Sequence, residues 1–142
     1  RIDVIATDHA PHTLNEKSNN YLNCPSGGPL VQHSLNMMFE HYLNKKITLE
    51  KIVQKMCHNP AILFRVNKRG FIRKNYFADI VIIDPRKNYT VDSNNILYKC
   101  GWSPFEGTKF NSQITHTFIN GNLVYENGLI NEDFRGKKIS FE

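Results

Sequence analysis

The first apolar run of the chain ends on a cluster of titratable residues. Residues 2–7 read IDVIAT, and the sequence DHAPH follows over residues 8–12. A short run of this kind predicts a strand buried on both faces, as in a parallel sheet covered by helices. Asp8 stands at its carboxyl end, where (β/α) barrels place their active sites. Asp8 has two possible roles. Its carboxylate either binds a divalent cation and exchanges a proton with an activated water, or it caps a turn before Pro11. The spacing alone leaves both open.

Two histidines follow Asp8 at a spacing of three residues. His9 and His12 are close enough to share one site, but an HxxH spacing is by itself weak evidence for metal ligation. His33 falls in a predicted helix, where we expect a partly buried side chain rather than a ligand. The remaining histidines are expected to be surface or structural residues: His41, His58 and His116.

Residues 8–28 form a long polar connection, and a loop of this length in a compact domain is usually functional or disordered. It ends in CPSGG over residues 24–28. This segment is either a flexible turn or a backbone cradle that offers N–H and C=O groups to a small polar ligand. A second glycine-bounded turn, GWSPFEG over residues 101–107, is expected to be a hydrophobic plug that packs Trp102 and Phe105 onto the barrel.

Apolar residues then recur at helical spacing in three segments. Pro29 suits the first position of a helix over residues 29–42. Thr48 is a good N-cap for a second helix, which extends to residue 57. An Asn-Pro pair predicts the cap and first position of a short third helix over residues 59–64.

The second half of the chain changes to strand patterns. Residues 77–84 predict a strand, closed by Asp-Pro. Residues 114–119 and 123–125 predict a hairpin around the Asn-Gly pair at 120–121. Residues 92–110 are expected to be irregular. The order of strand, loop, helices and a small β unit indicates an α/β protein.

Composition excludes several classes of function. The net charge is +5, but the 18 Lys and Arg residues are scattered and form no basic stripe with aromatic residues, so we expect no nucleic-acid partner. No apolar stretch approaches the roughly 18 residues of a membrane span. Cys24, Cys57 and Cys100 are far apart and odd in number, which argues against a disulfide framework or a structural zinc site. Reduced thiols in a cytoplasmic protein are the simplest interpretation.

Six segments together resemble a known family. In chain order they are IDVIATDHAPHTLNEKSN, PSGGPLVQHSL, NPAILFRV, RGFIRKNYFADIVIIDP, KCGWSPFEG and INGNLVYENG. They closely resemble the C-terminal third of bacterial-type dihydroorotases, which are cyclic amidohydrolases of the amidohydrolase superfamily. The most specific part is DHAPHT followed by Glu16 and Lys17. Because the chain opens on Arg1 inside a strand-like run, we expect a segment of a longer protein.

The resemblance implies a zinc-dependent hydrolase that interconverts N-carbamoyl-L-aspartate and L-dihydroorotate in de novo pyrimidine synthesis. In that family the residue matching Asp8 ligates a metal and moves a proton between the activated water and the ring amide nitrogen. The residue matching His12 helps to bind the substrate carboxylate. No role is carried over to His9. Backbone groups of the glycine-rich loop contact the same substrate, and here the matching residues are Cys24, Pro25, Gly27 and Gly28.

The same resemblance implies the architecture. Residues 1–66 are expected to form the C-terminal end of a (β/α)8 TIM-type barrel, with the active-site loop at 8–28, and residues 67–142 a segment of a small β-sandwich with a tail. A whole barrel needs about 250 residues. One or two zinc ions are expected per full-length subunit, with their other ligands outside this chain. The 142 residues alone are therefore expected to be inactive, and the full-length enzyme is expected to be a cytoplasmic homo-oligomer without membrane partners.

Two alternatives stay open. Allantoinases and dihydropyrimidinases or hydantoinases share the Asp at the strand end and the later β unit, although they usually differ around the two histidines. A non-catalytic homologue that acts as a scaffold is the second alternative, and the presence of both Asp8 and His12 argues against it.

Overall fold

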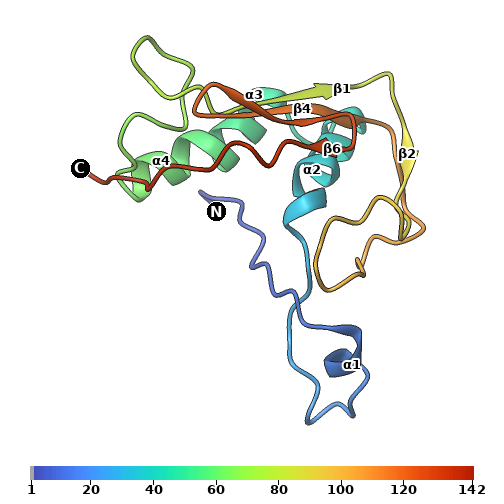
Figure 1. Ribbon diagram of the computed structural model, residues 1–142. Helices are drawn as coiled ribbons and strands as arrows, with labels where there is room; N and C mark the ends of the chain where they lie inside the picture. Colours follow the sequence, from blue (N-terminus) through green and yellow to red (C-terminus); the bar gives the residue numbers. More distant parts are fainter. Residues whose placement is uncertain (1) are drawn as a thin grey trace.

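The computed structural model describes residues 2–142, with helices in the first half and strands in the second (Figure 1). The helical elements are α1 (Leu14–Lys17), the 3-10 turn η1 (Val31–His33), α2 (Ser34–Leu43), α3 (Leu49–Val53), the π-helical turn η2 (Gln54–His58) and α4 (Asn59–Leu63). The strands are β1 (Ile80–Asp84), β2 (Tyr89–Thr90), β3 (Lys109–Phe110), β4 (Gln113–Ile119), β5 (Asn122–Glu126) and β6 (Leu129–Ile130). Within residues 2–142 no helix is long and apolar enough to cross a membrane.

The buried strand expected over residues 2–7 is not formed. The segment is extended, but no strand of residues 2–142 pairs with it, and Ile2 is 71% exposed. Instead it lies along the helices: Ile5 N–H donates to the Lys55 carbonyl at 3.1 Å, and the Lys55 ammonium donates to the Ile2 carbonyl. The apolar pattern was interpreted as a strand because such a run suits a parallel sheet, but a parallel strand also needs neighbours to supply its hydrogen bonds.

The helix predicted over residues 29–42 is present and begins two residues later than expected. η1 passes directly into α2, which buries Asn36, Met38 and Phe39. Asn36 Nδ2 donates to the Ser112 carbonyl at 3.0 Å, so α2 is hydrogen-bonded to the turn that precedes β4. A buried amide that finds its partner in this way fixes the helix against the β unit at little net cost.

The second and third predicted helices are one continuous helix. Thr48 caps it as expected, because its Oγ1 accepts from Lys51 N–H at 3.3 Å. The expected break at Asn59 does not occur: η2 joins α3 to α4, and Asn59 N–H donates five residues back to the Gln54 carbonyl. Pro60 has no N–H and would crowd the preceding turn of a regular α-helix. A wider π turn relieves that crowding, so the helix continues past the proline.

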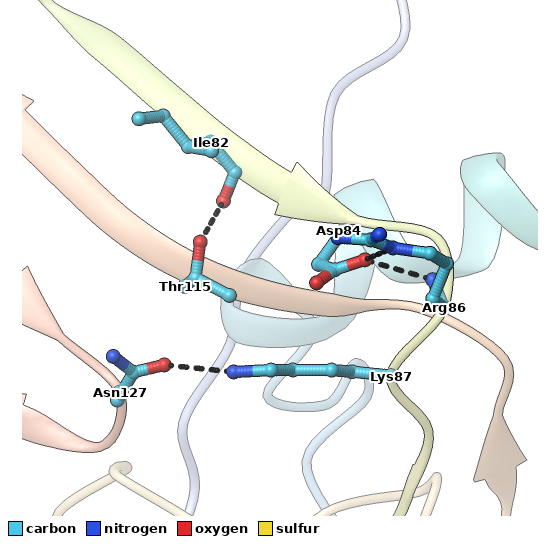
Figure 2. A network of polar contacts seen from close by, with 6 residues as sticks. All are labelled: Ile82, Asp84, Arg86, Lys87, Thr115 and Asn127. Carbon is cyan, nitrogen blue, oxygen red and sulfur yellow. Dashed lines mark hydrogen bonds and ion pairs between the residues drawn. The ribbon is translucent and has the colours of Figure 1, made fainter.

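A four-stranded antiparallel sheet forms most of the second half, in the order β1-β4-β5-β6. The predicted Asn-Gly hairpin joins β4 to β5, and Asn120 and Gly121 have φ values of 53° and 84°, as a type I′ turn requires. Figure 2 shows one polar contact between the neighbouring strands β1 and β4, and another between the loop after β1 and the turn after β5. Thr115 Oγ1 donates to the Ile82 carbonyl at 3.3 Å, and the Lys87 ammonium donates to Asn127 at 3.3 Å.

A second, two-stranded sheet was missed, and one of its strands, β3, lies within residues 92–110, which were expected to be irregular. β2 pairs with β3. Val91, directly after β2, and Phe110, in β3, are among the most buried residues that the structure describes. Phe110 stacks on the imidazole of His33 from the other half of the chain, at 6.0 Å between ring centroids. Residues 89–110 therefore pack against the start of the α2 helix, beside the loop that carries the candidate site (Figure 1).

Candidate active site

The loop over residues 8–28 is closed at its base by main-chain pairing. His9 and Gly28 form a parallel bridge, and Ala10 N–H donates to the Gly28 carbonyl at 3.0 Å. Figure 1 shows the rest of the loop, with α1, extending away from the helices and sheet. The pairing places the start of DHAPH beside the end of CPSGG, and these are the two segments that the sequence singled out.

Asp8 lies at this base with an available side chain. Its backbone is in the left-handed region at φ 46°, which Asp adopts more readily than most residues. The side chain is exposed, and it makes no hydrogen bond or ion pair within residues 2–142. A carboxylate that is used for neither a turn nor a cap is free to hold a cation or a proton.

His12 is half-buried, and its backbone is held from both sides. Its N–H donates to the Ala10 carbonyl at 2.9 Å, and its own carbonyl accepts from Trp102 Nε1–H at 2.7 Å. The expectation of a hydrophobic plug therefore describes Trp102 only in part, because its indole N–H fixes the residue predicted to bind substrate. Phe105 does pack as a plug, with ring centroids 5.7 Å from His33 and 5.8 Å from Phe110.

A capping box follows His12 and starts α1. Thr13 Oγ1 accepts from Glu16 N–H at 3.3 Å, and Thr13 N–H donates back to the Glu16 carboxylate at 2.7 Å. These hydrogen bonds from Thr13 hold the pKa of Glu16 below its ordinary value, with a smaller contribution from His12. The Thr-x-x-Glu signature predicts such a helix start, and sequence reasoning missed it.

Lys17, at the end of α1, organises the second half of the loop. Its ammonium donates to the Pro25 carbonyl at 2.6 Å and to the Gly27 carbonyl at 3.1 Å. Cys24 is held as well, since its N–H donates to the Asn20 carbonyl at 2.8 Å and its thiol donates to the Lys17 carbonyl at 3.4 Å. No local sequence pattern predicts the contacts of the Lys17 ammonium with Pro25 and Gly27, because they depend on how the loop folds back on itself.

Two glycines sit where the loop passes closest to its neighbours. Gly27 has φ +82°, and a Cβ placed on it would lie 2.7 Å from Ala10 Cβ. A Cβ on Gly28 would lie 3.7 Å from Trp102 Cη2, which is ordinary contact. Gly27 is therefore required both by the backbone conformation and by the lack of space.

Side chains from distant parts of the chain satisfy the N–H groups at the start of η1. His9 Nδ1 accepts from Leu30 N–H at 3.1 Å and from Val31 N–H at 3.4 Å. The Tyr98 hydroxyl accepts from Gln32 N–H at 2.8 Å. The His9 and Tyr98 rings are also in contact, with centroids 5.2 Å apart. Sequence reasoning assigned no role to His9.

His33 is fully buried, further than expected, and is a structural residue. Its Nδ1 lies 3.3 Å from Ser103 Oγ, while Nε2 has no partner within residues 2–142. Burial lowers the pKa of His33, so the ring is kept neutral. Within residues 2–142, none of the other three histidines, His41, His58 and His116, belongs to a group of three side chains that could hold a metal ion. His58 stacks on Phe71 and His116 pairs with Glu126 at 3.3 Å.

The donor set fits a divalent metal only in part. Within residues 2–142 no three His, Cys, Asp or Glu side chains are grouped so that they could hold an ion. Asp8 offers one exposed carboxylate, a hard ligand that suits zinc, whereas His9 Nδ1 is already used by backbone N–H groups. The described residues therefore supply one candidate ligand, and a complete site needs further ligands from elsewhere.

Comparison with known proteins shows the family to which the chain belongs. The family model described as "Amidohydrolase family" matches residues 2–124. The chain is 34% identical over 139 residues to a dihydroorotase of Pyrococcus furiosus, and the match covers 98% of this chain and 32% of that protein. It is 37% identical over 125 residues to a dihydroorotase of Clostridioides difficile, covering 87% of this chain and 29% of that protein. The chain thus spans about a third of the length of these curated relatives.

Hydantoinases are among the solved structures that the chain resembles. The match to a D-hydantoinase structure covers 90% of this chain and 29% of the hydantoinase chain, with a TM-score of 0.82. Because the sequence identity is 22%, this match shows a likeness of fold. An L-hydantoinase (dihydropyrimidinase) from Arthrobacter aurescens matches 91% of this chain and 30% of its own, with a TM-score of 0.80 at 28% identity.

Proposed function

Because this chain belongs to the amidohydrolase family, we propose that the polypeptide carrying it is a dihydroorotase, which cyclises N-carbamoyl-L-aspartate to L-dihydroorotate and reverses that reaction. The observation that supports the proposal is the loop base, where the main-chain bridge between His9 and Gly28 pairs the segment that carries Asp8 and His12 with the end of residues 24–28. The identity to curated dihydroorotases over nearly the whole chain supports the choice of ring.

Asp8 is the catalytic residue of this chain. Opening a cyclic amide requires that water loses a proton and that the departing ring nitrogen gains one. An exposed carboxylate at the loop base can take the first proton on an Oδ atom and deliver it to the nitrogen. Asp8 would also hold a zinc ion, which when bound supplies an activated water and polarises the carbonyl. The other ligands of the zinc site, which decide how many ions it holds, lie outside the described residues.

His12 and the glycine-rich loop bind the carboxylate of the substrate. An anion needs donors, and the imidazole of His12 can supply one. The Pro25 and Gly27 carbonyls are already occupied by Lys17, and Cys24 N–H by Asn20. Pro25 has no N–H, so we assign the donors on this side to the N–H groups of Gly27 and Gly28.

The architecture follows from the same reasoning. Residues 1–66 form the end of a (β/α)8 barrel, in which the extended residues 2–7 become the last strand once neighbouring strands are present. Residues 67–142 belong to a small β-sandwich. The whole enzyme is a cytoplasmic homo-oligomer whose partner is its small substrate. Hydantoin is the second candidate substrate, because the matching solved structures include an L-hydantoinase at 28% identity.

The test is Asp8→Asn in the intact polypeptide, with Asp133→Asn on the exposed C-terminal segment as a matched control. We expect kcat for dihydroorotate hydrolysis to fall about a thousandfold or more in the first variant, and to stay within about twofold in the second. Hydantoin, dihydrouracil and allantoin are assayed in parallel. Turnover of one of those rings in place of dihydroorotate would contradict the proposed substrate, and an active Asp8→Asn variant would contradict the role of Asp8.

A further inference from the structure

We propose that His9 is a positioning residue, which caps the start of η1 from across the loop and so holds residues 24–28 in place against Asp8. This inference rests on the proposed function, because the loop matters for catalysis only if it binds substrate. It assigns a task to the one residue of DHAPH that neither the residue pattern nor the family resemblance explains.

The helix start lacks a cap of its own. The first N–H groups of a helix have no acceptor within the helix and are normally satisfied by a Ser, Thr, Asp or Asn at the N-cap. Here the N-cap is Leu30, which has no side chain able to accept, and the residue before it is a buried proline. The helix therefore depends on an acceptor from elsewhere in the fold.

His9 supplies that acceptor. Its Nδ1 lies 3.1 Å from Leu30 N and 3.4 Å from Val31 N, and the Tyr98 hydroxyl takes the next N–H, that of Gln32, at 2.8 Å. Three successive N–H groups are thus satisfied by side chains 21 to 66 residues away in sequence. Contact with the Tyr98 ring, 5.2 Å between centroids, orients the imidazole for this task.

The position of His9 gives the cap its consequence for the site. His9 follows Asp8 directly, and the capped residues 30 and 31 follow the glycine-rich loop with only Pro29 between them. The cap adds side-chain bonds to the main-chain bond from Ala10 to Gly28. Without it, only the main-chain pairing of residues 9 and 10 with Gly28 would fix the spacing between Asp8 and residues 24–28 at this point, so substrate binding should weaken before the chemical step does.

Three variants of the intact polypeptide separate the acceptor from the ring. His9→Asn keeps an acceptor at the position of Nδ1, because its Oδ1 is the same number of bonds from the backbone. His9→Phe keeps the ring against Tyr98 but cannot accept. His9→Gln carries its acceptor one bond too far. We expect His9→Phe and His9→Gln to raise KM for dihydroorotate about tenfold with kcat within about threefold, and His9→Asn to stay within about threefold in both.

Two results would overturn the inference: wild-type kinetics in His9→Phe, or equal losses in His9→Phe and His9→Asn, which would show that keeping the acceptor does not preserve the role of His9. If His9→Phe does not fold, the comparison of His9→Gln with His9→Asn decides in the same way.

Hydrogen exchange distinguishes this inference from the proposed function. If the wild-type protein does not act on dihydroorotate, the proposed function fails, while the Leu30 and Val31 amides still report on the cap. They should exchange about tenfold faster in His9→Phe than in His9→Asn. Equal exchange rates in the two variants would refute the capping role whatever the substrate is.

Discussion

Replacing Gly27 with alanine should separate the shape of the loop from its chemistry. The residue has φ +82°, and the new Cβ would lie 2.7 Å from Ala10 Cβ, where ordinary contact is 3.4–4 Å. Loop and neighbour must therefore move apart by about 1 Å to reach normal packing. The displacement falls between the segment that follows Asp8 and the N–H groups assigned to the substrate carboxylate.

Two costs contribute to this change, and a control separates them. The left-handed backbone costs a non-glycine residue about 1–2 kcal/mol, of which about 0.4–1 kcal/mol is offset because alanine restricts the unfolded chain. Gly107 has the same φ of +82° with nothing within 4 Å of its Cβ position. Gly107→Ala therefore carries the backbone cost alone, while Gly27→Ala adds the overlap, about 1–3 kcal/mol for an overpacked site.

The assay is steady-state hydrolysis of dihydroorotate, together with urea unfolding of each variant. A misplacement of about 1 Å can cost about a hundredfold in rate, so we expect kcat/KM to fall by about ten- to a hundredfold in Gly27→Ala and less than threefold in Gly107→Ala. Adding Ala10→Gly removes the overlapping methyl group and should restore most of the loss. The reasoning is wrong if Gly27→Ala performs like Gly107→Ala, or if Ala10→Gly gives no recovery.

Two further predictions concern the elements that support the site. Trp102→Phe removes the N–H that donates to the His12 carbonyl at 2.7 Å. Losing a hydrogen bond worth about 1 kcal/mol predicts that KM rises about fivefold while kcat changes little. An unchanged KM would show that the contact does not position His12. Burial lowers the pKa of His33, so below about pH 6.5 the unfolded chain binds a proton that the folded chain does not. Stability should therefore fall as the pH drops from about 6.5 toward the folded-state pKa, by at most about 1.4 kcal/mol per pH unit. Urea unfolding from pH 7.5 to 5 should show a shallower decline in His33→Gln, and the same slope in both proteins would contradict the assignment.

The features that sequence predicted correctly are those with local causes. Thr48 caps its helix with its own hydroxyl, and the Asn-Gly pair at 120–121 adopts the positive φ values that only a few residues tolerate. The β4–β5 hairpin follows from that turn and from the apolar residues on either side of it. In each case the residues that carry the signal also make the structure.

The features that sequence missed depend on residues far apart in the chain. The strand over residues 2–7 requires neighbours that residues 2–142 do not provide. Pro60 was interpreted as a helix start because an Asn-Pro pair is typical of a cap and first helical position, whereas a π turn carries the helix past it. The candidate site shows the same division. The pattern singled out Asp8 and His12, but Trp102 is 90 residues from the carbonyl that it holds.

The closed base of the loop has an evolutionary consequence. Main-chain pairing at His9 and Gly28, with Lys17 bound to Pro25 and Gly27, fixes the site without using the tip, where Tyr21 and Leu22 are 93% and 90% exposed. Lengthening a loop costs little, about 0.6 kcal/mol for each doubling. The tip can therefore gain, lose or exchange residues while the proposed site at the loop base keeps its geometry.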